Sequence, residues 1–288
     1  MIIRRFLVGL FCSLFIASCT NDSSTTSGSS VLLAVGDIVE CSSGNSQLTA
    51  DIIKLYPTAT VATLGDNVYE VGSKEEFECY DQTWGKFNLR TNPSVGNHEY
   101  ETANAKGYFD YFNSRAGDPD KGYYTYQLGS WRMIALNSNC EYNGGCGANS
   151  PQYRWLNKIL STSQERCTLA YMHHPWRSSG PHGSSESIKL LVELLYEYGA
   201  DVVLSGHDHI YERFSLQDPH GRADKRRGMR QFVVGTGGRS LHEIDEPLNN
   251  SEVRNNEVHG ILKLNLNENL YTWEFLGVKE GFVDKGES

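Results

Sequence analysis

The amino-acid sequence predicts an α/β fold. Short apolar runs alternate with segments of helical periodicity from Val31 to Leu204, a pattern typical of strands and helices that follow one another along the chain. In the C-terminal part, apolar runs follow one another without helical segments between them. We therefore expect an α/β core and a second, more antiparallel sheet.

Each expected element rests on its pattern of apolar residues. Runs of four to eight apolar residues predict strands, and apolar residues at helical spacing predict helices. Strands of the core are expected at Val31–Val35, Thr60–Leu64, Trp131–Asn137, Thr168–Met172 and Asp201–Leu204. The helices between them are expected at Gln47–Leu55, Lys74–Phe87, Gln152–Leu160 and Ser187–Tyr198. Later strands are expected at Gln231–Val234, Gly260–Leu266 and Leu270–Leu276, the last two joined by a tight turn at Asn267–Asn269.

Composition excludes several classes of protein. The 288 residues are 39% hydrophobic and 21% charged, so the chain can bury a core and is neither disordered nor collagen-like. The net charge of -9 argues against binding to a nucleic-acid backbone, which requires a basic face. Small phosphorylated substrates stay compatible with this charge, because bound metal ions can supply positive charge locally.

The N-terminus has the pattern of an export signal. Arg4 and Arg5 precede the apolar run Phe6–Ala17, which is shorter than the ~20 residues of a membrane span. The run ends in Ile-Ala-Ser-Cys19, which resembles the lipobox of bacterial lipoproteins; an ordinary signal peptide followed by an unrelated Cys is the alternative. We expect a signal peptide at 1–18, a lipid on Cys19, a flexible Ser/Thr/Gly tether at 19–30 and one catalytic domain at 31–288.

Cysteine usage agrees with export, because exported proteins can form disulfides. Cys140 and Cys146 flank a Gly-rich turn and are the first candidate pair. Cys41 with Cys79 is a second candidate, and Cys167, which opens an apolar strand, is expected to be a buried free thiol. The sequence alone leaves this connectivity open.

Polar residues with metal-binding capacity follow five of the strand ends. They occur in Gly36-Asp37, Gly65-Asp66-Asn67, Gly96-Asn97-His98, His173-His174 and Gly206-His207-Asp208-His209. Ligands of open α/β sheets bind outside the carboxyl ends of the strands, so these side chains are expected at one rim. Carboxylate and amide oxygens with imidazole nitrogens suit Zn, Fe or Mn, and the set exceeds the four ligands of one zinc ion. Two metals that share a carboxylate are therefore expected.

These motifs, in this order, resemble those of the calcineurin-like metallophosphoesterase superfamily. Tyr69, three residues after Asp66, and the run from His207 to Arg213 are similar to the purple acid phosphatases within it. The Ser/Thr protein phosphatases have Asp at the position of Tyr69, followed by Arg-Gly, whereas Glu70 and Val71 follow here. The resemblance implies a four-layer α/β/β/α sandwich of two mixed sheets flanked by helices, with the two metals at the carboxyl ends of the strands.

The resemblance also implies the two sets of metal ligands. Asp37, Asp66, Tyr69 and His209 would hold Fe(III), and Asp66, Asn97, His173 and His207 would hold a divalent Fe, Zn or Mn. Asp66 would be shared by both. A metal-bound hydroxide would then attack phosphorus, because the metal lowers the pKa of its water.

Three further histidines are candidates for contact with the substrate. His98, next to the ligand Asn97, would bind phosphate or protonate the leaving group, and Asn97 would also face the substrate. Relatives have a substrate-facing His about ten residues after the ligand His, a place that His182 fills nine residues after His173. His174 either supports a ligand near the substrate or caps the strand.

For the other histidines and for one basic segment, the sequence predicts only a general position or role. His220, His242 and His259 lie outside every ligand pattern and are expected at the surface. The basic residues between Arg222 and Arg230 either steer an anionic substrate or form a solvated loop.

The sequence thus predicts a metal-dependent phosphatase that hydrolyses phosphate monoesters outside the cytoplasm. We expect it in the bacterial cell envelope, in contact with the membrane only through the lipid on Cys19. A phosphodiesterase with the same site is the first alternative, because the sequence does not show how much room surrounds the metals. A non-catalytic surface binding lipoprotein is the second, although Asp66, Asn97 and His98 are all present.

Overall fold

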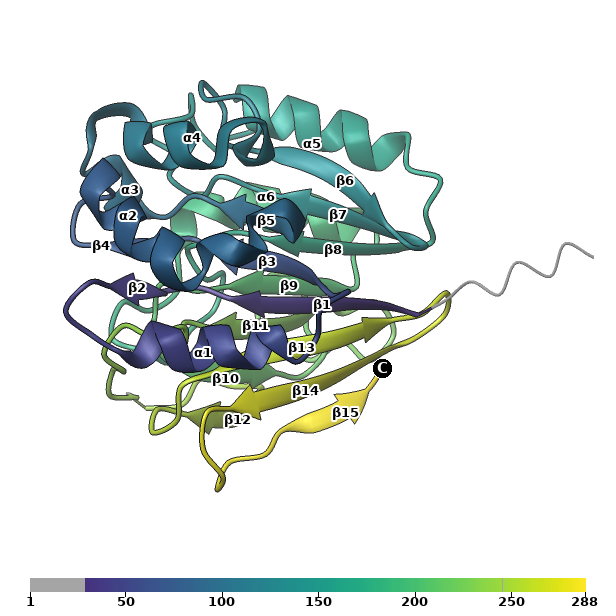
Figure 1. Ribbon diagram of the computed structural model, residues 1–288. Coiled ribbons are helices and arrows are strands. Elements are labelled where there is room, and N and C mark those ends of the chain that lie inside the picture. Colours follow the sequence, from purple (N-terminus) through teal and green to yellow (C-terminus); the bar gives the residue numbers. More distant parts are fainter. Residues whose placement is uncertain (1–28, 245) are drawn as a thin grey trace, which may run out of the picture.

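The computed structural model describes residues 29–244 and 246–288 (Figure 1). The expected signal peptide, Cys19 and nearly all of the tether lie outside the described residues. Within the described part, no helix is long and apolar enough to cross a bilayer.

Two mixed sheets form the centre of the fold (Figure 1). The first has the strand order β15-β14-β13-β1-β3-β5 and the second has the order β12-β10-β11-β9-β8-β7-β6. The first sheet comprises β1 (Ser30–Val35), β3 (Thr60–Leu64), β5 (Thr91–Ser94), β13 (Gly260–Leu266), β14 (Tyr271–Gly277) and β15 (Lys285–Glu287). The second comprises β6 (Tyr124–Leu128), β7 (Trp131–Ala135), β8 (Cys167–Tyr171), β9 (Val202–Ser205), β10 (Tyr211–Phe214), β11 (Arg230–Val234) and β12 (Ser251–Asn255). A short ribbon pairs β2 (Val39–Glu40) with β4 (Val68–Tyr69).

Alternate residues of the second sheet face two different cores. Leu169 and Tyr171 of β8 belong to the large core shared with the first sheet. Ala170 of the same strand belongs to a separate core with Leu156 of α5 (Pro151–Ser161) and Leu191 of α6 (Lys189–Glu197). Because successive side chains of a strand point to opposite faces, this sheet lies between the first sheet and the helices α5 and α6.

The outer face of the first sheet has its own helices. Ala50 and Ile53 of α1 (Asn45–Lys54) are buried in the large core on this side, and Phe77 of α2 (Lys74–Thr83) packs against Tyr111 and Phe112. In Figure 1, α1 lies across β1 and β13. The two remaining helices, α3 (Asn97–Tyr100) and α4 (Lys106–Phe112), follow β5. The expected four-layer sandwich is therefore confirmed.

From the sequence we expected the C-terminal strands to form a second sheet of their own, and this prediction is wrong. Instead they are divided between the two sheets. β13 pairs antiparallel with β1, with Leu264 opposite Leu32, and β11 pairs parallel with β9, with Gln231 opposite Val203. Apolar alternation marks a residue as part of a strand, but it does not identify the partner strand.

Several helix bounds also differ from those expected. The helix expected at Lys74–Phe87 ends at Thr83, and a 3₁₀ turn continues from Gly85 to Arg90. α2 begins where Ser73 and Glu76 form a capping box, with each side chain accepting from the other residue's backbone N–H. No helix was predicted from the sequence at Lys106–Phe112, where the structure has α4. The short strands β2, β4, β5, β6, β10, β12 and β15 were not predicted as elements.

Both expected disulfides are present, Cys41–Cys79 and Cys140–Cys146. Among the residues that the structure describes, Cys167 has no disulfide partner. It is only partly buried, contrary to the expectation of a buried thiol, because it lies at the start of β8. Burial nevertheless raises its pKa to about 11, so the thiol is protonated and unreactive at neutral pH.

Candidate metal centre and active site

Three of the candidate ligands follow directly after strands and have left-handed backbone conformations. Asp37 follows β1 with φ 61°, Asp66 follows β3 with φ 45°, and His207 follows β9 with φ 70°. Residues other than glycine rarely adopt positive φ, and such strain concentrates at functional sites. Each turn aims a polar side chain back toward the same rim of the two sheets.

Glycines next to these ligands allow the backbone to approach the cluster closely. A Cβ atom on Gly96 would lie 2.0 Å from Oδ1 of Asp66, and one on Gly206 would lie 2.5 Å from Oδ2 of Asp37. Both distances are shorter than any real contact, so a side chain at either position would displace a candidate ligand. The glycines of the sequence motifs are therefore required by packing around the site.

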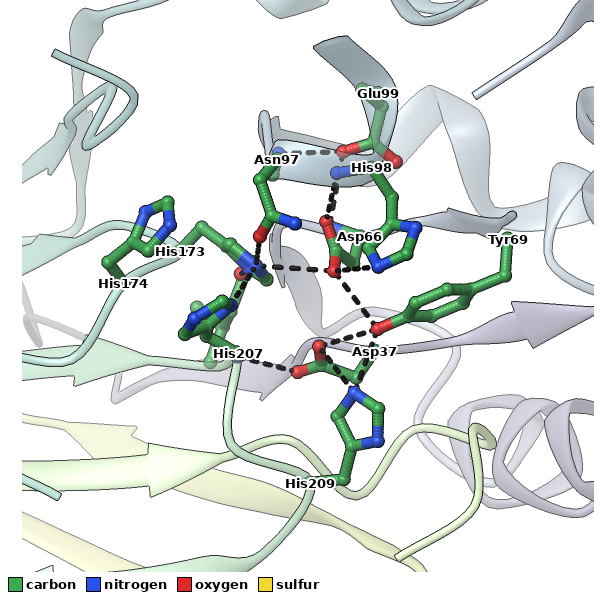
Figure 2. A network of polar contacts seen from close by, with 12 residues as sticks. Asp37, Asp66, Tyr69, Asn97, His98, Glu99, His173, His174, His207 and His209 are labelled. Atoms are coloured by element: carbon green, nitrogen blue, oxygen red, sulfur yellow. Dashed lines mark hydrogen bonds and ion pairs between the residues drawn. The ribbon is translucent and has the colours of Figure 1, made fainter. Parts of the chain in front are cut away.

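Tyr69 points its hydroxyl group at three other candidate ligands (Figure 2). Its oxygen lies 2.8 Å from Oδ1 of Asp37 and 3.0 Å from Oδ2 of Asp66. It also lies 3.0 Å from Nε2 of His209. The Nδ1–H of His209 donates to the backbone carbonyl of Ser240 at 2.8 Å, so Nε2 presents a lone pair. One phenolic proton thus faces three acceptors.

A second convergence surrounds His173. Its Nδ1–H donates to the carbonyl of Leu64 at 2.9 Å, which leaves a lone pair on Nε2. That nitrogen lies 2.9 Å from Oδ1 of Asn97, 3.1 Å from Nδ1 of His207 and 3.3 Å from Oδ2 of Asp66. Asp66, His173 and His207 have potential ligand atoms within 4.8 Å of one another. Asp66 belongs to both groups of candidate ligands, because its Oδ2 lies near the Tyr69 hydroxyl and near Nε2 of His173.

Such converging lone pairs fit a pair of cations. Metal-ligating histidines characteristically donate their other N–H to a backbone carbonyl, as His173 and His209 do. Hard oxygen donors on one side and an imidazole-rich set on the other suit first-row transition metals.

The electrostatics of the protein groups point the same way. Burial raises the pKa of Asp37 to about 8, and the nearby charge of Asp66 adds to this shift. Burial also raises the pKa of Tyr69 well above its usual range, reinforced by Asp37. Burial lowers the pKa of His209 to about 3, and His242 adds to this effect. Burial therefore disfavours the anionic forms of Asp37 and Tyr69. Asp66 differs, because despite burial the neighbouring His173 lowers its pKa, and Asp66 in turn raises the pKa of His173 to about 9. Metal ions would stabilise the carboxylates and a phenolate, and would replace the proton on His173.

The remaining candidates surround a pocket of about 230 Å³. Its lining is formed by Asp66, Tyr69, Asn97, His98, His182, His207, His209, Arg239, Ser240 and His242. The backbone N–H of His98 donates to Oδ1 of Asp66 at 3.0 Å, and its Nδ1–H donates to the carbonyl of Glu70 at 2.5 Å. Its Nε2 lies 3.9 Å from Oδ2 of Asp66. The exposed His182 lies on the other side, with its ring centroid 4.5 Å from that of His207.

Comparison with known proteins identifies the family. The family model described as calcineurin-like phosphoesterase matches residues 30–211, which include all the motifs up to His209. The chain belongs to the calcineurin-like phosphoesterase family.

Within this family, the curated relatives include plant purple acid phosphatases. Purple acid phosphatase 15 of Arabidopsis thaliana is 32% identical over 192 residues, covering 57% of this chain and 34% of the relative. Purple acid phosphatase 23 of the same plant is 30% identical over 196 residues, covering 60% and 40%. The chain thus spans about a third to two fifths of the length of these two relatives.

Solved structures share the fold. A purple acid phosphatase from Lupinus luteus seeds has a TM-score of 0.72 at 20% identity, covering 90% of this chain and 53% of that one. GAP50, an anchor in the inner membrane complex of Plasmodium, has a TM-score of 0.66 at 14% identity, with coverage of 89% and 88%. Since the fold occurs in an anchor as well as in a phosphatase, the chemistry must be argued from the site.

Among the predicted residues of this phosphoesterase, His174 lies apart from the pocket. Its Nδ1 lies 2.8 Å from the hydroxyl of Ser138, and its ring centroid is 4.4 Å from that of His207. Burial lowers its pKa to about 3, with His173 adding to the shift. This placement favours the alternative in which His174 is neutral and orients a ligand, rather than contact with the substrate.

Two buried carboxylates of the phosphoesterase site, Glu99 and Asp208, had no role assigned to them from the sequence. Glu99 accepts hydrogen bonds from the backbone N–H groups of Gly96 (2.6 Å), Asn67 (2.6 Å), Asp66 (3.1 Å) and Val68 (3.3 Å). Figure 2 shows it behind Asn97 and His98. Asp208 lies between the candidate ligands His207 and His209 in the sequence and is buried, and its side chain accepts from the hydroxyl of Ser178 and from the backbone N–H of His182. Asp208 lies inside one of the sequence motifs and Glu99 directly follows another, but the sequence does not show which groups they bond.

Two pocket residues lie outside every motif. Arg239 places its guanidinium 4.7 Å from the ring centroid of Tyr69 and forms ion pairs with Glu40 (3.0 Å) and Glu70 (2.7 Å). His242 lines the pocket, so the expectation of a surface histidine was wrong. No signal in the sequence marks either residue, because both lie on an irregular segment after β11 that the tertiary fold brings to the site.

The basic segment between Arg222 and Arg230 does not line this pocket. Arg222 pairs with Asp218 at 2.8 Å in an exposed turn. Arg230 is buried in β11, where it lies 3.3 Å from Glu252 and over the ring of Trp273. These positions favour structural roles over steering of a substrate into the pocket.

Proposed function

We propose that this chain is a dimetal phosphoesterase that hydrolyses phosphate monoesters. The observation that carries the proposal is the position of Asp66, whose Oδ2 lies between the Tyr69 hydroxyl and Nε2 of His173. One carboxylate oxygen that faces two distinct ligand sets is the arrangement by which two metals can be bridged. Similarity to purple acid phosphatases supports the same activity.

The two ligand sets differ in charge, and this supports two different metals. Asp37, Asp66, Tyr69 and His209 combine three oxygen donors that can be anionic with one imidazole, which suits Fe(III). On the other side of Asp66, the side chains of Asn97, His173 and His207 would bind a metal as neutral donors, which suits a divalent Fe, Zn or Mn ion. When bound, the metal pair supplies an activated water and positive charge for the phosphoryl group that is transferred.

The histidines that are not ligands supply hydrogen bonds and protons. Because Nδ1–H of His98 is bound to the carbonyl of Glu70, any proton that His98 shares with the leaving oxygen is carried on Nε2. That nitrogen lies 3.9 Å from Oδ2 of Asp66, and both residues line the pocket. His182, on the opposite side, contacts another part of the phosphoryl group.

We further propose that the enzyme acts in the bacterial cell envelope, anchored through a lipid on Cys19. The basic and apolar start of the chain and the two disulfides support export. In a lipoprotein-processing bacterium, Cys19→Ala should move the protein from the membrane fraction to the soluble fraction. Mass spectrometry should find acylated Cys19 at the mature N-terminus of the wild type.

The deciding experiment compares a chromogenic phosphate monoester with the matching diester. The purified protein with its native metals should turn over the monoester much faster than the Asp66→Asn variant does. This substitution keeps the size of the side chain but removes its charge. Asp110→Asn, the same change on the exposed face of α4, should leave turnover unchanged. Preference for the diester would replace the proposal with a phosphodiesterase. No turnover of either, in protein shown to hold two metals, would contradict catalysis and favour a binding role.

A further inference from the structure

His242 has a defined place beside the first ligand set. Its ring stacks on that of His209 with centroids 3.8 Å apart and an interplanar angle of 24°. Its side chain is 22% exposed and lines the pocket. A histidine held this closely to a candidate ligand, yet open to the pocket, can contact whatever binds there.

Backbone contacts fix the tautomer of this histidine. The backbone N–H of His209 donates to Nδ1 of His242 at 3.2 Å, and the backbone N–H of His242 donates to the carbonyl of His209 at 3.1 Å. A ring nitrogen that accepts an N–H carries a lone pair, so the neutral ring of His242 has its proton on Nε2. Nε2 is on the ring edge away from these contacts and is therefore a hydrogen-bond donor.

Asp208 links His242 to the other pocket histidine. Oδ1 of this buried carboxylate lies 3.8 Å from Nδ1 of His242 and accepts from the backbone N–H of His182 at 3.0 Å. The rings of His182 and His242 have centroids 5.2 Å apart. The two imidazoles thus lie next to each other, and the same carboxylate lies close to both residues.

His182, Asp208 and His242 also offer ligand atoms within 4.8 Å of one another, as a cation site would. However, Nδ1 of His242 and Oδ1 of Asp208 already accept backbone N–H groups. These lone pairs are used for positioning, which favours the donor function of His242 over metal binding.

We propose that His242 is a substrate-binding residue whose Nε2–H donates to an oxygen of the phosphoryl group. This inference rests on the proposed function, since it assumes that phosphate esters occupy the pocket. A hydrogen bond to an anionic oxygen is stronger than one between neutral groups. It would hold the phosphoryl group on the His209 side while His98 contacts it from the Tyr69 side.

Two substitutions separate this role from a purely structural one. His242→Asn places an amide oxygen where Nδ1 accepts from His209, but it has no donor at the position of Nε2. His242→Gln places an amide nitrogen near the position of Nε2. We expect His242→Asn to weaken binding of inorganic phosphate about 10- to 100-fold by calorimetry, and His242→Gln to recover most of it. Both variants should retain two metals per chain.

The outcomes are distinct. If His242→Asn binds phosphate as tightly as the wild type, or if both variants lose metal and phosphate together, His242 acts only by supporting His209 and the inference is overturned. If the wild-type protein with two metals does not bind phosphate, the proposed function fails and this inference fails with it.

A measurement on the wild type covers the case in which the variants do not fold. Phosphate should slow the modification of His242 by diethylpyrocarbonate, mapped by mass spectrometry, at least severalfold. The exposed His220 serves as the control and should react at the same rate with and without phosphate. Equal modification of His242 in the two conditions would also overturn the inference.

Discussion

Replacement of Glu99 by Gln tests whether one buried carboxylate holds the two ligand-bearing segments together. In the wild type, Oε2 accepts from the N–H groups of Asp66 and Gly96, and Oε1 accepts from those of Asn67 and Val68. Glutamine keeps one oxygen and presents an NH₂ group in place of the other. Whichever way the amide turns, two buried N–H donors face a donor and lose their acceptor.

The structure gives the size of the effect. Each buried donor without a partner costs about 1–3 kcal/mol, so Glu99→Gln should lower the free energy of unfolding by about 2–6 kcal/mol. The lower end applies if the loop between β3 and β4 relaxes. A loss of this size is a large fraction of the 5–15 kcal/mol typical of folded proteins. The affinity for the second metal should fall as well, because the segments that carry Asp66 and Asn97 lose the hydrogen bonds that join them through Glu99.

Urea unfolding of the metal-free protein is the appropriate assay, because bound metal would stabilise the folded state by mass action. The control is Glu101→Gln, the same chemical change two residues away on an exposed side chain, which should change stability by less than about 0.5 kcal/mol. If Glu99→Gln unfolds at the same urea concentration as Glu101→Gln, the four hydrogen bonds to the Glu99 carboxylate do not stabilise the fold as proposed.

Three further predictions concern the ligands and a buried acid. Tyr69→Phe should abolish the visible charge-transfer band of the iron-loaded protein, because the phenolate donor is lost; an unchanged spectrum would remove Tyr69 from the metal. Asn97→Ala should lower the metal content from two toward one per chain, measured by elemental mass spectrometry, and retention of both would contradict its assignment. Burial raises the pKa of Asp201 from 3.8 to about 6, so the folded state prefers the protonated acid. Wild-type stability should therefore fall by up to about 3 kcal/mol between pH 4 and pH 6 relative to Asp201→Asn, in denaturant titrations across that range; parallel pH profiles would refute this.

Local sequence patterns were sufficient to predict where several candidate ligands lie along the chain relative to the strands. Asp37, Asp66 and His207 each follow an apolar run and a glycine, so their positions at strand ends could be predicted without knowledge of the fold. The positive φ values that aim these side chains could not be predicted, because residues other than glycine adopt them only when surrounding structure compensates for the strain.

The residues around the ligands depend on contacts that are distant in sequence. His242 touches His209 across 33 positions, and Glu99 bonds Asn67 across 32. Neither contact leaves a periodic or compositional signal, whereas the ligands themselves occur in short motifs. The expectation that His242 lies at the surface failed for this reason.

By itself, the sequence determined that this chain forms an α/β fold and that Asp, Asn and His side chains follow its strands, and it offered candidate cysteine pairs without deciding among them. Only the tertiary structure decided which strands share a sheet, since β1 finds β13 more than two hundred residues away. It also decided which polar residues outside the motifs, such as Arg239, reach the pocket. The physical reason is that periodicity and turn residues act over a few neighbours, whereas strand pairing and the enclosure of a site are selected by burial of the whole core.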